Sequence, residues 1–173
     1  GYGAISREIA TEVPNCDGIV VPYGLGGLAL GVVNALKHLN SSISVFVCEI
    51  AQHAPLQRAQ HAGHAVKGPK LSSFIEAMGT PEVIPDVFAD IRNHIEDVVT
   101  VTEDSVKHAI KSLFYKSDLR VEGAAGAAQQ RRAEGRGEAR GQKERRQRAA
   151  AVRCRDGTRR VADYSGHRAH GGR

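Results

Sequence analysis

The chain alternates between short apolar runs and stretches in which apolar residues return every three or four positions. Three continuous runs, "GIVVP", "ISVFVC" and "DVVTVT", are typical of strands that are buried on both faces of a sheet. Helical spacing is clearest after the first run, at Leu28, Val32, Leu36 and Leu39. The same spacing recurs in "AISREIATEV", "TPEVIPDVFADIRNHI" and "VKHAIKSLFYKS". The pattern therefore predicts alternating strands and helices over residues 1–130.

The order of these elements indicates the fold class. A strand, a glycine-rich turn, a helix and a second strand follow one another at 18–48, which predicts a right-handed βαβ unit with parallel strands. Thr102 stands before Glu103 and Asp104, where a hydroxyl can cap a helix and acidic side chains favour its dipole. We therefore expect an α/β layered architecture for residues 1–130.

Charge divides the chain into two parts. Residues 1–130 contain ten Lys and Arg against fourteen Asp and Glu, whereas residues 131–173 contain fourteen against five. The second part has no Leu, Ile, Phe or Met and consists mostly of Arg, Gly and Ala, so it offers too little apolar surface to offset its chain entropy. We expect residues 129–173 to be a disordered or only nascently helical tail.

Two explanations of this tail stay open. Arg, Gly and Ala have codons with G or C in the first two positions, so the tail is typical of GC-rich coding sequence read in a shifted frame. Arginine-rich segments also bind RNA, but Tyr164 is the one aromatic residue there for base stacking, which does not favour a nucleic-acid partner.

Cysteine spacing, the length of apolar runs and the start of the chain limit the class of protein. Cys16, Cys48 and Cys154 lie far apart, so we expect a reducing, cytoplasmic compartment rather than a disulfide framework. No apolar run approaches 18 residues, so no membrane span is predicted. The chain starts at Gly1 and has a single methionine, from which we expect a piece of a longer protein or an incomplete gene model.

The stretch "VVPYGLGGLALG" is the main candidate for chemistry, with three interpretations. "GLGGLA" satisfies G-x-G-x-x-G/A, and Glu49 follows at the spacing of a ribose-binding carboxylate in a dinucleotide site. Pro22 and Tyr23 intervene between strand and glycine, however, which fits an isolated phosphate at a helix N-terminus better. The third interpretation is a glycine turn that only allows close packing. A zinc site at His53, His61 and His64 is not favoured, because no Cys or carboxylate stands beside them at ligand spacing.

Several motifs taken together resemble one enzyme family. "VVPYGLGGLALG", "ISVFVCE", "EDVVTVTEDSV" and "VEGAAGAA" occur in the order seen in the pyridoxal-phosphate-dependent threonine and serine dehydratases, and the related serine racemases share the pattern. The opening "GYGAISREI" is similar to the "GQGT" stretch of that family. The resemblance covers residues 1–128 as the C-terminal part of the catalytic domain. It implies a fold type II architecture, which is a three-layer open parallel sheet with helices on both faces.

The resemblance also implies a cofactor site for pyridoxal phosphate. Gly24, Leu25, Gly26, Gly27 and Leu28 match the loop whose N–H groups hold the cofactor phosphate. Leu25 departs from glycine there, and if its position needed a positive φ the strain would be about 1–2 kcal/mol.

Three more positions match the family around this loop. Gly79 in "SSFIEAMGTPE" matches a glycine near the cofactor ring, and Glu122 matches a carboxylate on the pyridine side. For Glu122 an acid that favours a helix dipole is the alternative. Glu49 matches a residue that helps to bind a divalent cation in the racemase-like members, with a solvated strand-end carboxylate as the alternative.

The family's reaction sets the expected substrate. It removes the α-proton of threonine or serine, eliminates the β-hydroxyl and releases an oxo acid and ammonia, with the cofactor as electron sink. In the family the Schiff-base lysine lies upstream of the glycine loop, and the lysines of this chain match no catalytic motif, so we expect no turnover from this chain by itself. A homo-oligomer is expected for the full-length protein.

Overall fold

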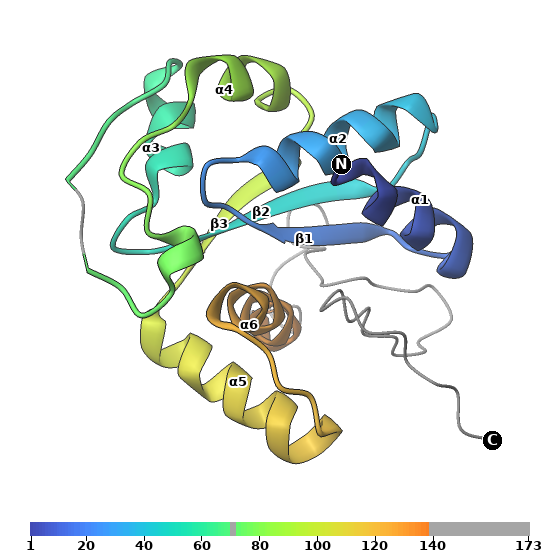
Figure 1. Ribbon diagram of the computed structural model, residues 1–173, viewed down its shortest axis with the longest axis vertical. Coiled ribbons are helices and arrows are strands. Elements are labelled where there is room, and N and C mark those ends of the chain that lie inside the picture. Colours follow the sequence, from blue (N-terminus) through green and yellow to red (C-terminus); the bar gives the residue numbers. More distant parts are fainter. Residues whose placement is uncertain (70–71, 139–173) are drawn as a thin grey trace.

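A computed structural model of the chain describes residues 1–69 and 72–138 (Figure 1). A parallel three-stranded sheet in the order β1-β2-β3 forms its centre. The strands are β1 (Gly18–Pro22), β2 (Ser44–Ile50) and β3 (Asp97–Val101). The helices are α1 (Gly3–Glu12), α2 (Gly27–His38), α3 (Pro55–Ala62), α4 (Pro85–Ile91), α5 (Glu103–Ser117) and α6 (Gly123–Glu138), with a 3₁₀ turn η1 at Glu76–Met78.

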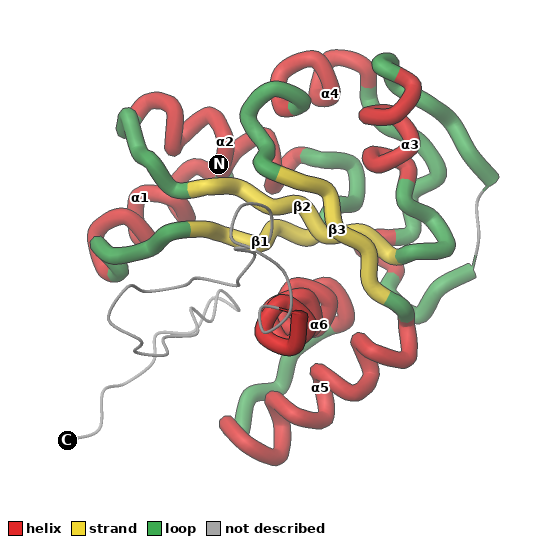
Figure 2. Tube along the Cα trace, turned by 180° about the vertical axis from the view of Figure 1, so that it is seen from behind, coloured by secondary structure: helices red, strands yellow, loops and turns green. Residues whose placement is uncertain are grey.

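The sheet lies between two layers of helices, which confirms the predicted α/β fold with helices on both faces. Helices α1, α2, α3 and α4 cover one face, and α5 and α6 cover the other (Figures 1 and 2). Alternate strand residues supply the two cores, so that Val21 and Val47 face the first layer while Val20 and Phe46 face the second. Burial on both faces explains why the strands read as continuous apolar runs.

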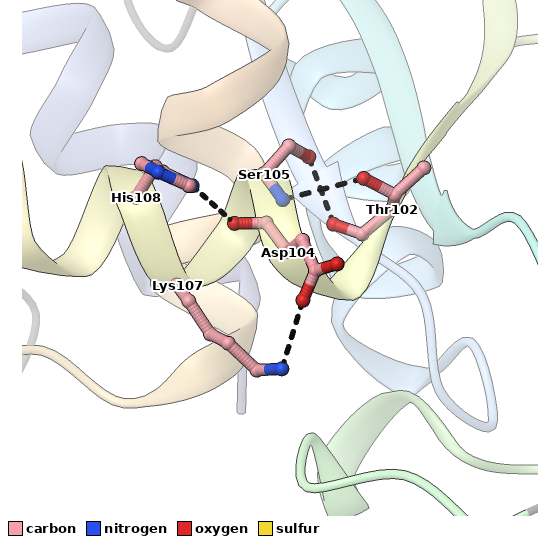
Figure 3. Close-up of polar contacts among 5 residues, drawn as sticks. All are labelled: Thr102, Asp104, Ser105, Lys107 and His108. Atoms are coloured by element: carbon pink, nitrogen blue, oxygen red, sulfur yellow. Dashed lines mark hydrogen bonds and ion pairs between the residues drawn. The ribbon is translucent and has the colours of Figure 1, made fainter.

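Local signals set the helix boundaries. The Thr102 hydroxyl accepts a hydrogen bond from the Ser105 N–H at 3.3 Å, and Asp104 in the first turn pairs with Lys107 at 2.9 Å (Figure 3). This confirms the predicted start of α5. Helix α4 begins with Pro85 in its first turn, after Ile84 in extended backbone, and ends at Ile91, so that Ile95 of the predicted apolar spacing lies beyond the helix.

The predicted boundary at residue 128 falls inside a helix. Helix α6 packs on the sheet through Ala124 and Ala127 and continues to Glu138, so residues 129–138, which were expected to be disordered or only nascently helical, are helical in the structure. Ala, Arg and Glu are good helix formers, which favours the continuation of a helix that is anchored at its start. The predictions for residues 139–173 fall outside the described residues. None of the described helices is long and apolar enough to cross a membrane.

Candidate functional site

The glycine turn connects the carboxyl end of β1 to α2. The Tyr23 N–H donates to the Cys48 carbonyl at 2.9 Å, which fixes the end of the strand. Gly26 then has φ +87° and caps α2, where no side chain supplies a cap hydrogen bond. The first helical hydrogen bond of α2 is donated by the Leu30 N–H to the Gly26 carbonyl at 2.8 Å. The N–H groups of 27–29 therefore precede the helical hydrogen bonds and, with the positive end of the helix dipole, favour an anion.

Two of the turn glycines are required by the surrounding structure. A Cβ on Gly24 would collide with the Ala77 carbonyl oxygen, and the Thr80 hydroxyl donates to the Gly24 carbonyl at 2.8 Å. A Cβ on Gly26 would lie 2.7 Å from Val87 Cγ1, in a backbone conformation that L residues rarely adopt. Close packing alone thus accounts for these two glycines, whereas it does not account for the free N–H groups that follow.

Leu25 does not carry the strain that a positive φ would bring. The described non-glycine residues with positive φ are Asn40, Ala54 and Asp118, and Leu25 is not among them. Its side chain is 53% exposed. The condition for about 1–2 kcal/mol of strain is therefore not met, because the left-handed position of this turn is Gly26, one residue later.

The segment around Gly79 packs beside the glycine turn. Besides the contact of Ala77 and Thr80 with Gly24, Ile75 is buried against Gly123, where an added Cβ would lie 2.8 Å from Ile75 Cγ1. Gly79 itself has φ −88°, and a Cβ there would meet only ordinary contacts at 3.5 Å or more. Its backbone and neighbours therefore allow other residues, and a ring contact at Gly79 stays a prediction.

Glu122 stands at the start of α6. Its carboxylate accepts hydrogen bonds from the Ala124 N–H at 3.0 Å and the Ala125 N–H at 3.1 Å. In this conformation Glu122 therefore acts as an acidic residue at a helix start, which is the alternative named for it above. Because Gly123 contacts Ile75, the structure brings the start of α6, segment 75–80 and the glycine turn to the same end of the sheet (Figure 1).

Glu49 is engaged by the start of another helix, α3. It is a residue of β2, 1% exposed, and its carboxylate accepts the Leu56 N–H at 2.8 Å and the Gln57 N–H at 2.9 Å. It thereby caps α3, because Ala54 at the N-cap position supplies no side-chain hydrogen bond. Burial raises the pKa of Glu49, against the lowering effect of the two N–H groups and of Arg58.

These contacts correct two interpretations of Glu49. The solvated strand-end carboxylate is wrong, and a ribose contact in a dinucleotide site is not supported, because both carboxylate oxygens are engaged inside the protein. Over the described residues no group of three or more His, Cys, Asp or Glu could hold a metal ion. His53 is buried while His61 and His64 are exposed, so the three histidines do not share one environment.

Tyr23 stands at the glycine turn, and sequence reasoning did not single it out as a candidate. It is 1% exposed, and within the described part of the chain its hydroxyl has no hydrogen-bond partner. The hydroxyl would lie 2.9 Å from a Cβ on Gly26, so it is next to the N-cap of α2. Burial, and secondarily the charge of Glu49, raise the pKa of Tyr23, which keeps the hydroxyl protonated. The sequence signal that could have indicated Tyr23 was the place of a polar aromatic residue between an apolar strand and the glycine turn.

A family profile described as "Pyridoxal-phosphate dependent enzyme" matches residues 1–152. The chain belongs to this family. The match confirms the resemblance drawn from the motifs and extends beyond residue 128, where those motifs ended.

Individual relatives match parts of their own length. The biosynthetic L-threonine dehydratase of Salmonella typhimurium is 32% identical over 114 residues, which are 66% of this chain and 22% of the dehydratase. The serine racemase of Mus musculus is 31% identical over 137 residues, which cover 74% of this chain and 38% of the racemase. The solved structure of threonine deaminase isoform 2 from Solanum lycopersicum has a TM-score of 0.69 at 25% identity, over 73% of this chain and 37% of that one, and so supports the fold. The chain thus spans well under half of these curated relatives.

Proposed function

We propose that the turn Gly24–Leu28 and the start of α2 hold the phosphate of pyridoxal phosphate. The observation that carries the proposal is the turn itself, where a helix begins at a left-handed glycine, without a side-chain cap, and presents free N–H groups. The family is pyridoxal-phosphate dependent, and the residues present fit the group: a Cβ would fill the turn at Gly24 and Gly26, and a buried hydroxyl beside it lacks a partner.

The neighbouring segments are proposed to support the cofactor ring. Gly79 lies on the segment that contacts Gly24, and Glu122 precedes Gly123, which packs on Ile75 of that segment; these contacts support a place near the ring for both. The divalent cation expected at Glu49 is left out of this proposal, because its carboxylate already binds the amides of α3.

For the whole protein we propose the elimination of threonine or serine to an oxo acid and ammonia. Pyridoxal phosphate, when bound, supplies an electron sink for the charge that develops at the substrate α-carbon. The relatives named as threonine dehydratases support this reaction, although the chain covers only 22% of their length. In this reaction the α-proton and the β-hydroxyl leave the amino acid, and water then releases ammonia.

Serine racemisation is the second candidate. Relatives named as serine racemases match 73–74% of this chain, against 66% for the biosynthetic dehydratases. With L-serine as substrate, formation of an oxo acid and ammonia by the whole protein would favour elimination, whereas formation of D-serine would favour racemisation.

Assembly and location are further proposals for the whole protein. We expect a homo-oligomer in a cytoplasmic compartment, with no membrane or nucleic-acid partner. The three cysteines, Cys16, Cys48 and Cys154, lie far apart in the sequence, which supports a reducing compartment.

The phosphate-binding proposal is tested by titrating the 173-residue chain with pyridoxal phosphate while absorbance and thermal unfolding are followed. We expect saturable binding, a raised midpoint of unfolding, and competition by inorganic phosphate but only weakly by pyridoxal. Gly26→Val should abolish binding, because its side chain would collide with Val87 and Tyr23. Gly63→Val is the matched control, since Gly63 also has positive φ but has open space around it. Equal effects of both variants would contradict the proposal.

A further inference from the structure

The hydroxyl of Tyr23 is buried and makes no hydrogen bond to any described residue. A buried hydroxyl without a hydrogen bond is costly, and most such groups in folded proteins have a partner. Tyr23 is 1% exposed and its hydroxyl is unpartnered over the described residues. The charge of Glu49 raises the pKa of Tyr23, but the Glu49 carboxylate accepts its two hydrogen bonds from the N–H groups of Leu56 and Gln57.

The position of this hydroxyl points to an external partner. Gly26 is the N-cap of α2, a helix of 12 residues that has no side-chain cap. A Cβ on Gly26 would lie 2.9 Å from both the hydroxyl and Cε2 of Tyr23, so the end of the ring lies directly at the start of the helix. An uncapped helix N-terminus and an unpartnered buried donor therefore meet at the same place, and both would be satisfied by one anion.

We propose that the Tyr23 hydroxyl donates a hydrogen bond to the phosphate group bound at the start of α2. Tyr23 would thus be a binding residue for the phosphate in addition to the backbone N–H groups of the turn. The inference rests on the proposed function, since it takes the ligand of the turn to be a phosphate ester. It adds a side-chain donor that distinguishes a phosphorylated ligand from the same ligand without phosphate.

Removal of this single oxygen tests the inference. In the full 173-residue chain, Tyr23→Phe keeps the ring and deletes the donor. We expect its affinity for pyridoxal phosphate, and for inorganic phosphate, to fall about tenfold or more, as for a lost hydrogen bond to a charged group. Binding of pyridoxal, which has no phosphate, should be unchanged. Tyr115→Phe is the matched control, because Tyr115 is 80% exposed on α5 and should alter no affinity.

The unliganded variant supplies a second readout with the opposite sign. Because the hydroxyl has no hydrogen-bond partner among residues 1–69 and 72–138, Tyr23→Phe should unfold at the same temperature as the parent chain or a higher one. A clear drop would mean that the hydroxyl already has a structural partner, and would overturn the inference. Unchanged phosphate affinity in Tyr23→Phe would also overturn it while leaving the proposed function intact. Failure of the parent chain to bind either pyridoxal phosphate or inorganic phosphate would overturn both.

Discussion

Glu49 joins β2 to α3, and its removal should be among the most destabilising single changes on this face of the sheet. In Glu49→Ala the N–H groups of Leu56 and Gln57 lose their acceptor, and no side chain at the N-cap of α3 can replace it. Each hydrogen bond to a charged group contributes about 1.5–3 kcal/mol. The carboxylate is buried, and relief of its desolvation offsets part of this sum. We expect a net loss of about 2–4 kcal/mol in the free energy of unfolding.

The pH dependence gives this prediction a sign. Burial raises the pKa of Glu49 in the folded chain above its value in the unfolded chain, which is about 4.3. The folded chain therefore holds the Glu49 proton more tightly than the unfolded chain does. The stabilisation that comes from this tighter proton binding is full below about pH 4 and is lost as pH rises through the folded pKa. Glu49→Gln keeps one acceptor oxygen and cannot titrate. Its stability should accordingly fall less than that of the parent chain as pH rises through this window.

Urea unfolding followed by circular dichroism from pH 4 to pH 8 measures both effects. Glu12→Gln, at an exposed position at the end of α1, is the matched control for removal of one carboxylate charge. A loss below about 0.5 kcal/mol in Glu49→Ala, the typical range of surface substitutions, would refute the role of Glu49 as the cap of α3. The same pH dependence in Glu49→Gln and the parent chain would refute the raised pKa.

Three further predictions concern the turn and the start of α5. Gly26→Ala should lower the free energy of unfolding, measured with urea or heat, by about 2–5 kcal/mol, because a positive φ and overpacking act together. Gly63→Ala should lower it by only about 1–2 kcal/mol, because only the positive φ acts there. Equal losses would argue against the packing of the turn. Leu25→Gly should lower the free energy of unfolding by up to about 1 kcal/mol through chain entropy, and a gain in stability would show that Leu25 is strained after all. Thr102→Ala should cost about 0.5–2 kcal/mol by loss of the hydrogen bond to the Ser105 N–H, and Thr102→Ser should restore most of it, since serine can cap equally well.

The sheet, its helices and the glycine turn could be predicted from the sequence because each rests on local patterns. Strands buried on both faces require continuous apolar runs, and the capping hydroxyl of Thr102 is adjacent to the helix that it caps. The family resemblance likewise depended on the order of contiguous motifs. These features need no knowledge of which distant residues meet.

The roles of Glu49 and Tyr23 depended on such distant contacts. The partner of Glu49 is the start of a helix seven residues later, which comes into reach only because the backbone turns at Ala54 with positive φ. Tyr23 is buried in a core cluster that also contains Phe88 and Ile91 of α4, more than sixty residues further along the chain. The boundary expected at residue 128 rested on the end of the motifs and of the apolar pattern, whereas helix α6, held by Ala124 and Ala127, continues to Glu138.

The central claim is that backbone N–H groups of the turn hold a phosphate, and amide chemical shifts test it directly. Spectra of the ¹⁵N-labelled chain would be recorded during titration with pyridoxal phosphate, and again with pyridoxal. We predict that the largest shifts fall on the amides of residues 24–29, and that pyridoxal does not produce them. Saturable binding with the largest shifts elsewhere in the chain, or the same shifts with pyridoxal, would contradict the account.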